Sequence, residues 1–167
     1  MNDAAENQIH LIVDVPTQRM QVFKGDQLLQ EYAVSTGSAG SGQINGSGCT
    51  PTGRHRIRIK IGDSLPRNTV FVGRRPTGEI YSPELAEEYP QRDWILTRIL
   101  WLTGSESGFN RGGSRDSLRR YIYIHGTPDT EPMGVAASHG CIRMRNDDLL
   151  ELFDLVSAGT EILIRDA

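Results

Sequence analysis

The first half of the chain consists of short segments in which apolar and polar side chains alternate. From residue 9 to residue 15 this period of two predicts a half-buried strand. Segments 20–23 and 28–34 read as two further strands, and the Lys-Gly-Asp turn between them predicts a hairpin. A surface loop rich in glycine and serine is expected over 37–48, and isoleucines that alternate with basic residues predict a strand over 57–61.

The second half mixes weakly and strongly patterned segments. The alternation fades over residues 62–120. Within them, Ser82 followed by a proline predicts a short helix over 83–88, and residues 94–102 are compatible with a strand. Regular alternation returns at 121–125, where tyrosines and a histidine alternate with isoleucines, and this predicts another strand.

A helix of about three turns is predicted near the C-terminus. Asn146 is its expected N-cap, Leu149 and Phe153 fall on one helical face, and Gly159 follows its end. Residues 162–164 supply a final strand. Many short strands and one clear helix predict a mainly β fold, with sheets in a sandwich and the helix packed on them.

The domain organisation expected from these patterns is simple. A chain of 167 residues is long enough to bury one core without disulfides or metals, so residues 1–167 are predicted to form a single domain. Residues 1–7 are expected to be a flexible tail, and residues 62–120 an irregular insert and candidate lid.

Composition and charge exclude several classes of protein. A formal net charge of −3 and the lack of any Lys/Arg run argue against a nucleic-acid partner. No window holds the roughly 18 to 20 consecutive apolar residues of a membrane span. The N-terminus lacks the basic and apolar regions of a secretory signal, which predicts a cytoplasmic protein, or a periplasmic one if a signal was trimmed.

The chemistry-bearing residues are concentrated in two segments, His125-Gly126-Thr-Pro and residues 138–144. In extended chain, residues two apart share a face. This places His139, Cys141 and Arg143 together on one face. The same rule places Tyr121, Tyr123 and His125 together on the other segment.

A cysteine and a distant histidine in this setting predict acyl-transfer chemistry. The thiolate is the nucleophilic form of cysteine, and a histidine within hydrogen-bond reach can take the proton of Cys141. Gly140 leaves room for a substrate backbone and lets amides point at a developing oxyanion. Arg143 is suited to gripping a carboxylate. The plainer alternatives are a buried structural thiol at Cys141 and a surface Arg143 paired with Asp147 or Asp148.

These residues resemble the catalytic domain of the bacterial L,D-transpeptidases, the YkuD-like family. The family's signature is a histidine followed at a distance by Ser/Thr-His-Gly-Cys, an aliphatic residue and Arg or Asn, and here it reads His125, twelve residues, then Ser138 to Arg143. The Thr-Pro-Thr-Gly-Arg block at 50–54 is similar to a second family segment. The resemblance covers residues 8–62 and 121–165 and leaves the insert unmatched.

The resemblance implies an L,D-transpeptidase-type β-sandwich with a C-terminal helix and an irregular insert. It also implies a substrate, the peptide stem of peptidoglycan, cleaved between diaminopimelate and a terminal D-alanine through a thioester on a cysteine. No cofactor is implied. The implied catalytic residues are the nucleophile, its base, the carbonyl that orients the base and the oxyanion-hole residues: Cys141, His125, Gly126, His139 and Gly140. Arg143, Tyr123 and Ser138 are the implied substrate-binding residues.

The resemblance also bears on whether water or an amine accepts the acyl group. Family members without an export signal resemble cytoplasmic L,D-carboxypeptidases of murein recycling, so hydrolysis of a tetrapeptide stem is expected, with transpeptidation as the alternative. A rival of another class is a zinc-binding module that uses Cys49, His125, His139 and Cys141. Only His139 and Cys141 come near the close ligand spacing of structural zinc sites, which argues against it.

Overall fold

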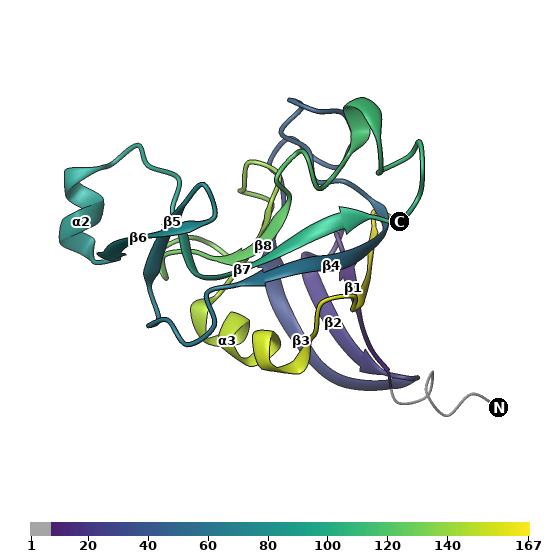
Figure 1. The fold of residues 1–167 in the computed structure, drawn as a ribbon, viewed down its shortest axis with the longest axis horizontal. Coiled ribbons are helices and arrows are strands. Elements are labelled where there is room, and N and C mark those ends of the chain that lie inside the picture. The colour runs from purple at the N-terminus through teal and green to yellow at the C-terminus, as the bar shows by residue number, and fades with distance from the viewer. Residues whose placement is uncertain (1–7) are drawn as a thin grey trace.

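The computed structural model describes residues 8–167, so the predicted tail 1–7 lies outside the described residues. Its strands and helices confirm a mainly β fold with a helix near the C-terminus (Figure 1). The strands are β1 (Ile9–Asp14), β2 (Arg19–Lys24), β3 (Gln27–Ser35), β4 (Gly53–Ile61), β5 (Thr69–Val72), β6 (Arg75–Ile80), β7 (Ile95–Gly104), β8 (Tyr123–Gly126), β9 (Ile142–Met144) and β10 (Glu161–Arg165). The helices are α2 (Pro83–Glu88), the 3-10 turn η1 (Gly113–Arg115) and α3 (Asn146–Leu155).

The strands form one sheet that closes on itself. Their order is β4-β10-β1-β2-β3-β9-β8-β7-β5-β6, and β4 also pairs with β7. The β4–β7 pairing turns eight of the strands into a closed wall, while β5 and β6 extend from β7 (Figure 1). Closure leaves few exposed strand edges and gives the inward side chains of opposite walls a common interior.

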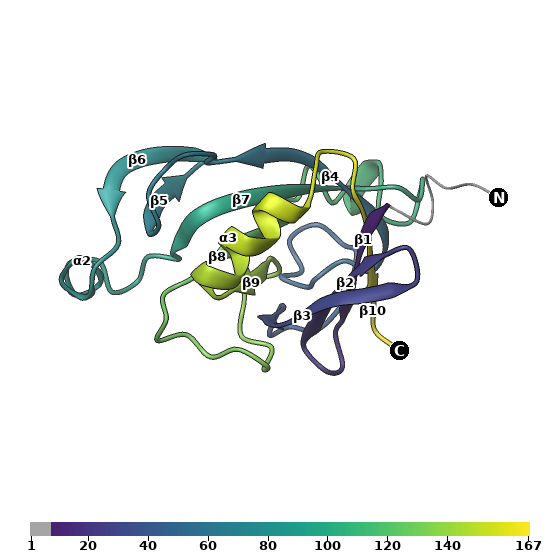
Figure 2. The same ribbon diagram turned by 90° about the horizontal axis from the view of Figure 1, so that it is seen from below.

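The core fills this interior and includes one face of α3. Figure 2 shows α3 beside β7 and β8. Leu149, Leu152 and Phe153 follow helical spacing and are buried against side chains of β7 and β8. The predicted helical face is therefore confirmed. None of the helices within residues 8–167 is long and apolar enough to cross a membrane.

The segment 62–120 is more regular than the sequence predicts. It contains β5, β6, the short helix over 83–88 and the strand over 94–102, the latter two both confirmed. Ser82 caps α2 as predicted, because its side chain accepts the backbone N–H of Leu85 at 3.1 Å. β7 pairs with β4, β5 and β8, so this segment supplies a central strand of the sheet.

Two local predictions are wrong. The N-cap of α3 is Arg145, and Asn146 is the first helical residue, with its side chain directed away from the helix N–H groups. Strand β8 begins at Tyr123 rather than at Tyr121. Tyr121 has a φ of 58°, a left-handed conformation that a strand residue does not adopt.

Candidate active site

His125 and Cys141 line one cavity of about 230 Å³, as their place in the sheet requires. Strands β8 and β9 are parallel neighbours, with His125 opposite Arg143. Cys141 directly precedes β9, and Cys141 and Arg143 both line this cavity. The predicted meeting of the two segments is therefore present. The cavity is also lined by Asp93, Ile95, Arg120, Tyr121, Ile122, Tyr123, Ser138 and His139.

The Cys141 thiol is half-buried and held by backbone groups. Its Sγ accepts the N–H of Tyr123 at 3.3 Å and donates to the carbonyl oxygen of Tyr121, also at 3.3 Å. Burial raises the pKa of the thiol to about 11, against the lowering effects of the Tyr123 N–H and of the Arg143 and Arg120 charges. The resting thiol is therefore protonated at neutral pH and needs a base before it can attack.

The imidazole ring of His125 is neutral, as a general base must be. Its side chain is buried, at 2% exposure, and Nδ1 donates to the Gly126 carbonyl oxygen at 2.7 Å, which leaves Nε2 as the accepting nitrogen. Burial lowers the pKa of the ring, so it is neutral at pH 7. Among residues 8–167 the sulfur has hydrogen bonds to backbone groups and none to His125. Proton transfer therefore requires the thiol to leave the Tyr121 carbonyl.

The turn that carries the cysteine is fixed by two hydroxyl groups. Ser138 Oγ donates to the Cys141 carbonyl at 2.5 Å and accepts the Gly140 N–H at 3.2 Å. Thr50 Oγ1 donates to the Gly140 carbonyl at 2.8 Å. The Gly140 amide predicted for the oxyanion hole is thus already bonded to Ser138. Substrate contact by Ser138 stays a prediction.

Glycine is required at position 140 for a steric reason. Gly140 has a φ of +125°, and a Cβ there would lie 3.2 Å from the Cys49 carbonyl oxygen. Any other residue would strain the backbone beside the nucleophile.

Arg143 is paired inside the protein. Its guanidinium lies 3.2 Å from Asp93 and 3.7 Å from Glu131, and it donates to the Ala137 carbonyl at 3.2 Å. The alternative partners expected from the sequence are wrong, because Asp147 instead pairs with an arginine of another segment. A substrate carboxylate can reach this buried guanidinium only in competition with Asp93 and Glu131. Substrate binding by Arg143 stays a prediction.

His139 stands at the mouth of the cavity. Its side chain is 73% exposed, and Nδ1 lies 3.4 Å from the second oxygen of Asp93. Asp93 therefore links His139 to Arg143 by a carboxylate bridge. This position is compatible with a contact to substrate, although none of these distances assigns His139 to an oxyanion.

Two residues of the cavity, Asp93 and Arg120, are not predicted by the sequence patterns. Arg120 donates to the Cys49 carbonyl at 2.6 Å and to the Gly42 carbonyl at 3.2 Å, so it ties the 37–48 loop to the cavity. Each residue directly precedes a predicted strand, and this position is the sequence feature that could have pointed to it. Sequence periodicity does not predict whether the side chain of a loop residue points toward a cysteine far along the chain.

Tyr123 and Cys49 have mainly structural surroundings. Tyr123 is buried, and its hydroxyl accepts an N–H of Arg74 at 3.0 Å, so it forms a wall of the cavity. Cys49 Sγ lies 3.5 Å from the Ala39 carbonyl. In the described part of the chain no three His, Cys, Asp or Glu side chains are grouped so as to hold a metal ion.

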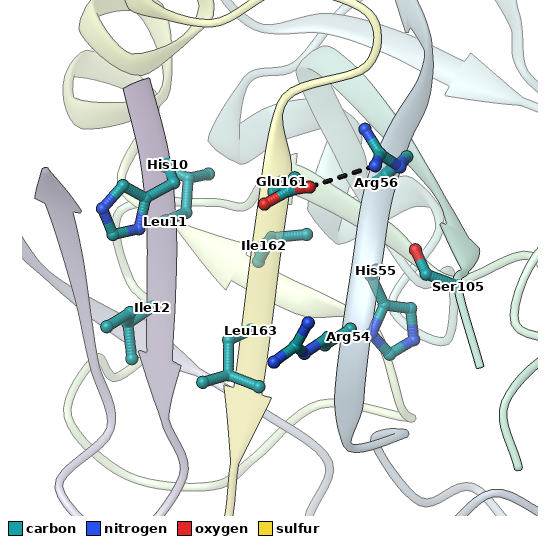
Figure 3. Close-up of a pocket in the computed structure, with 10 residues that line it drawn as sticks. All are labelled: His10, Leu11, Ile12, Arg54, His55, Arg56, Ser105, Glu161, Ile162 and Leu163. Carbon is teal, nitrogen blue, oxygen red and sulfur yellow. Dashed lines mark hydrogen bonds and ion pairs between the residues drawn. The ribbon is translucent and has the colours of Figure 1, made fainter. Parts of the chain in front are cut away.

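A second cavity, of about 420 Å³, lies on β1, β10 and β4 (Figure 3). Its rim carries the Arg56–Glu161 ion pair, at 3.0 Å, and it contains no cysteine. The buried His55 beside it is bonded to the Gly53 carbonyl at 3.1 Å and to Ser117 Oγ at 2.8 Å. Burial lowers the pKa of His55 to about 4. The His55 ring and the Ser117 hydroxyl are both buried, so this pair has a structural role and is closed to a substrate.

Comparison with known proteins gives consistent matches. Residues 8–164 match the family model for the L,D-transpeptidase catalytic domain, including the segment 62–120 that the sequence motifs left unmatched. A Bacillus subtilis (strain 168) protein whose name places it among the L,D-transpeptidases, YqjB, is 27% identical over 94% of this chain and 71% of its own length. The Salmonella typhimurium (strain LT2) protein ErfK/SrfK, with a name of the same kind, is 49% identical over 70% of this chain and 40% of its own length.

Solved structures give the same fold. An L,D-transpeptidase from Mycobacterium smegmatis superposes with a TM-score of 0.58 at 19% identity, covering 95% of this chain and 58% of that one. At this identity the likeness establishes the fold alone. The chain thus spans little more than half of the solved structure and less than half of ErfK/SrfK.

Proposed function

The chain belongs to the family of L,D-transpeptidase catalytic domains, and from this we propose that it is a cysteine acyl-transfer enzyme acting on the peptide stems of peptidoglycan. The observation that carries the proposal is the shared cavity of Cys141 and His125. The neutral ring of His125, held by the Gly126 carbonyl, is suited to act as a general base there.

We propose the following first half-reaction. His125 Nε2 takes the proton of Cys141, and the sulfur attacks the carbonyl carbon that joins the L-centre of diaminopimelate to D-alanine. A C–S bond forms and the C–N bond breaks. The D-alanine amine leaves with the proton returned by His125. The product is a thioester on Cys141.

For the second half-reaction, we place hydrolysis first. The cavity of about 230 Å³ is smaller than the roughly 300–1,000 Å³ of typical ligand pockets. It accommodates one stem end, and water needs no further binding site to act as the acceptor. This describes an L,D-carboxypeptidase, which would suit trimming of tetrapeptide stems in murein recycling. The cytoplasmic location expected from the sequence stays a prediction, testable by cell fractionation.

Transpeptidation is the second candidate, favoured by the names of the relatives. The same thioester would then be resolved by an amine of a second stem. The open mouth beside His139, whose side chain is mostly exposed, offers an approach for that amine.

One experiment tests both candidates. The protein is incubated with a defined tetrapeptide stem ending in D-alanine, with and without an amine acceptor, and the products are identified by mass spectrometry. Tripeptide as the main product supports hydrolysis, while cross-linked or amine-exchanged product supports transfer. Intact stem under all conditions, with a folded protein, would refute the proposed function.

A further inference from the structure

The carbonyl that orients His125 lies beside a distorted part of the sheet. The pairing of β7 with β8 shifts register between Leu96 and Ile99, the partners of Gly126 and His125. Thr97, within this shift, is fully buried and has a φ of 77°. A β-branched residue adopts such a backbone only where surrounding contacts hold it there, and such strain is concentrated at functional sites.

Asn146 supplies those contacts. Its Oδ1 accepts the hydroxyl of Thr97 at 2.7 Å, and its Nδ2 donates to the Thr127 carbonyl at 3.0 Å and to Asn68 Oδ1 at 3.2 Å. The side chain is 1% exposed and caps no helix N–H group. A buried amide whose donors and acceptor are all satisfied is held rigidly.

Asn146 also packs directly on Gly126. A Cβ at position 126 would lie 2.1 Å from Asn146 Oδ1 and 2.6 Å from the Leu96 carbonyl oxygen. Asn146 therefore covers Gly126 with its oxygen and bonds the next carbonyl, that of Thr127, with its nitrogen. The carbonyl oxygen of the Gly126–Thr127 peptide accepts the Nδ1–H of His125. Asn146 therefore contacts this peptide at both of its residues.

We propose that Asn146 is a positioning residue for His125. By fixing the peptide between Gly126 and Thr127, it fixes the direction of the Gly126 carbonyl, and so the ring orientation and the tautomer of His125. The carbonyl is uncharged and cannot attract the ring as a carboxylate would, so its fixed direction is what it contributes. The proposal rests on the proposed function only in that His125 is the base.

The test is ¹⁵N NMR of the histidine ring, which reads the tautomer without any substrate. The wild-type ring is expected to carry its proton on Nδ1 alone, whereas Asn146→Ala should give a mixture of the two neutral tautomers. With the stem peptide, kcat should fall about tenfold or more while KM stays within about twofold. A folded Asn146→Ala protein with the wild-type ring signal would overturn the proposal, whatever its activity.

Matched variants separate positioning from stability. Thr97→Ser keeps the hydroxyl and should keep the wild-type ring signal, while Thr97→Ala removes it and should mix the tautomers. Thr97→Ala decides the question if Asn146→Ala does not fold, because a single Nδ1–H signal in it would refute the proposal. Leu152→Ala weakens the core of α3 elsewhere. If it mixes the tautomers equally, the effect is general destabilisation and the proposal fails.

Discussion

His125 and Arg143 are directly opposite each other in the parallel pairing of β8 and β9. This register forms the cavity of the candidate site, because Cys141 directly precedes β9 and lines the same cavity as His125 and Arg143. Arg143 is in turn fixed by Asp93 and by the Ala137 carbonyl. The pairing of β8 with β9 thus brings Cys141 and His125 to one cavity, and among residues 8–167 the sulfur is bonded to backbone groups and not to the ring.

Replacing the two cysteines should have opposite results. We expect Cys141→Ala to abolish release of D-alanine from a tetrapeptide stem, because the other free thiol, Cys49, does not line the cavity that holds His125. Cys49→Ala should keep nearly full activity, since its sulfur contacts only backbone carbonyls of its own loop. Liquid chromatography of released D-alanine measures both, and turnover by Cys141→Ala would disprove the assignment of the nucleophile.

The reactivity of Cys141 should depend steeply on pH. Because burial raises the pKa of the thiol to about 11, the thiolate fraction, and with it the alkylation rate, should rise about tenfold per pH unit between pH 8 and pH 10. The measurement is the rate of mass increase with iodoacetamide, in Cys49→Ala protein so that one thiol reports. A plateau reached below pH 9 would contradict the raised pKa of the thiol.

Removing the Asp93 charge should activate the thiol. Asp93 raises the pKa of Cys141, so Asp93→Asn is expected to speed alkylation at pH 8 roughly two- to threefold, a fraction of a pKa unit. Glu131→Gln is the matched control. It also loses a carboxylate near Arg143, yet Glu131 is not among the groups that shift this pKa. An equal effect of both changes would point to release of Arg143 instead.

Stability should fall with acid because of His55. Its pKa is about 4 in the fold against an ordinary 6.5, so the unfolded chain binds the proton first as the pH drops. The stabilisation is complete above pH 6.5 and is lost progressively toward pH 4, by up to about 3 kcal/mol. Urea unfolding at several pH values measures it, and His55→Gln should show a shallower loss. An unchanged slope in that variant would exclude His55 as the cause.

The sequence predicts that the segments carrying His125 and Cys141 meet at one cavity, because each segment is short and has a clear local pattern. The alternation of β8 and the Ser-His-Gly-Cys turn are local patterns, and the pairing of neighbouring strands brings them together. Local patterns also predict the strands of the N-terminal half and the apolar face of α3.

The residues that local patterns could not predict act through contacts between distant segments. Asp93 reaches Arg143 from a loop 50 positions away, and its identity alone says nothing about its direction. Asparagine is a common N-cap residue, because its side chain can accept a helix N–H. The Asn146 side chain instead bonds to Thr97 and Thr127. The hydrogen bonds of this buried amide to distant segments therefore outweigh its preference for capping the helix.

The pairing of β7 with both β4 and β8 limits how this domain can be re-engineered. Deleting residues 62–120, on the assumption that they form a lid, would remove β7, the strand that pairs with β8 beside His125. The deletion would also leave β4 with an unpaired edge. A chimera that exchanges specificity with a relative should therefore graft only the part from β5 to the end of α2 and retain β7. The boundary of such a graft is the end of α2, because β7 belongs to the closed wall of strands.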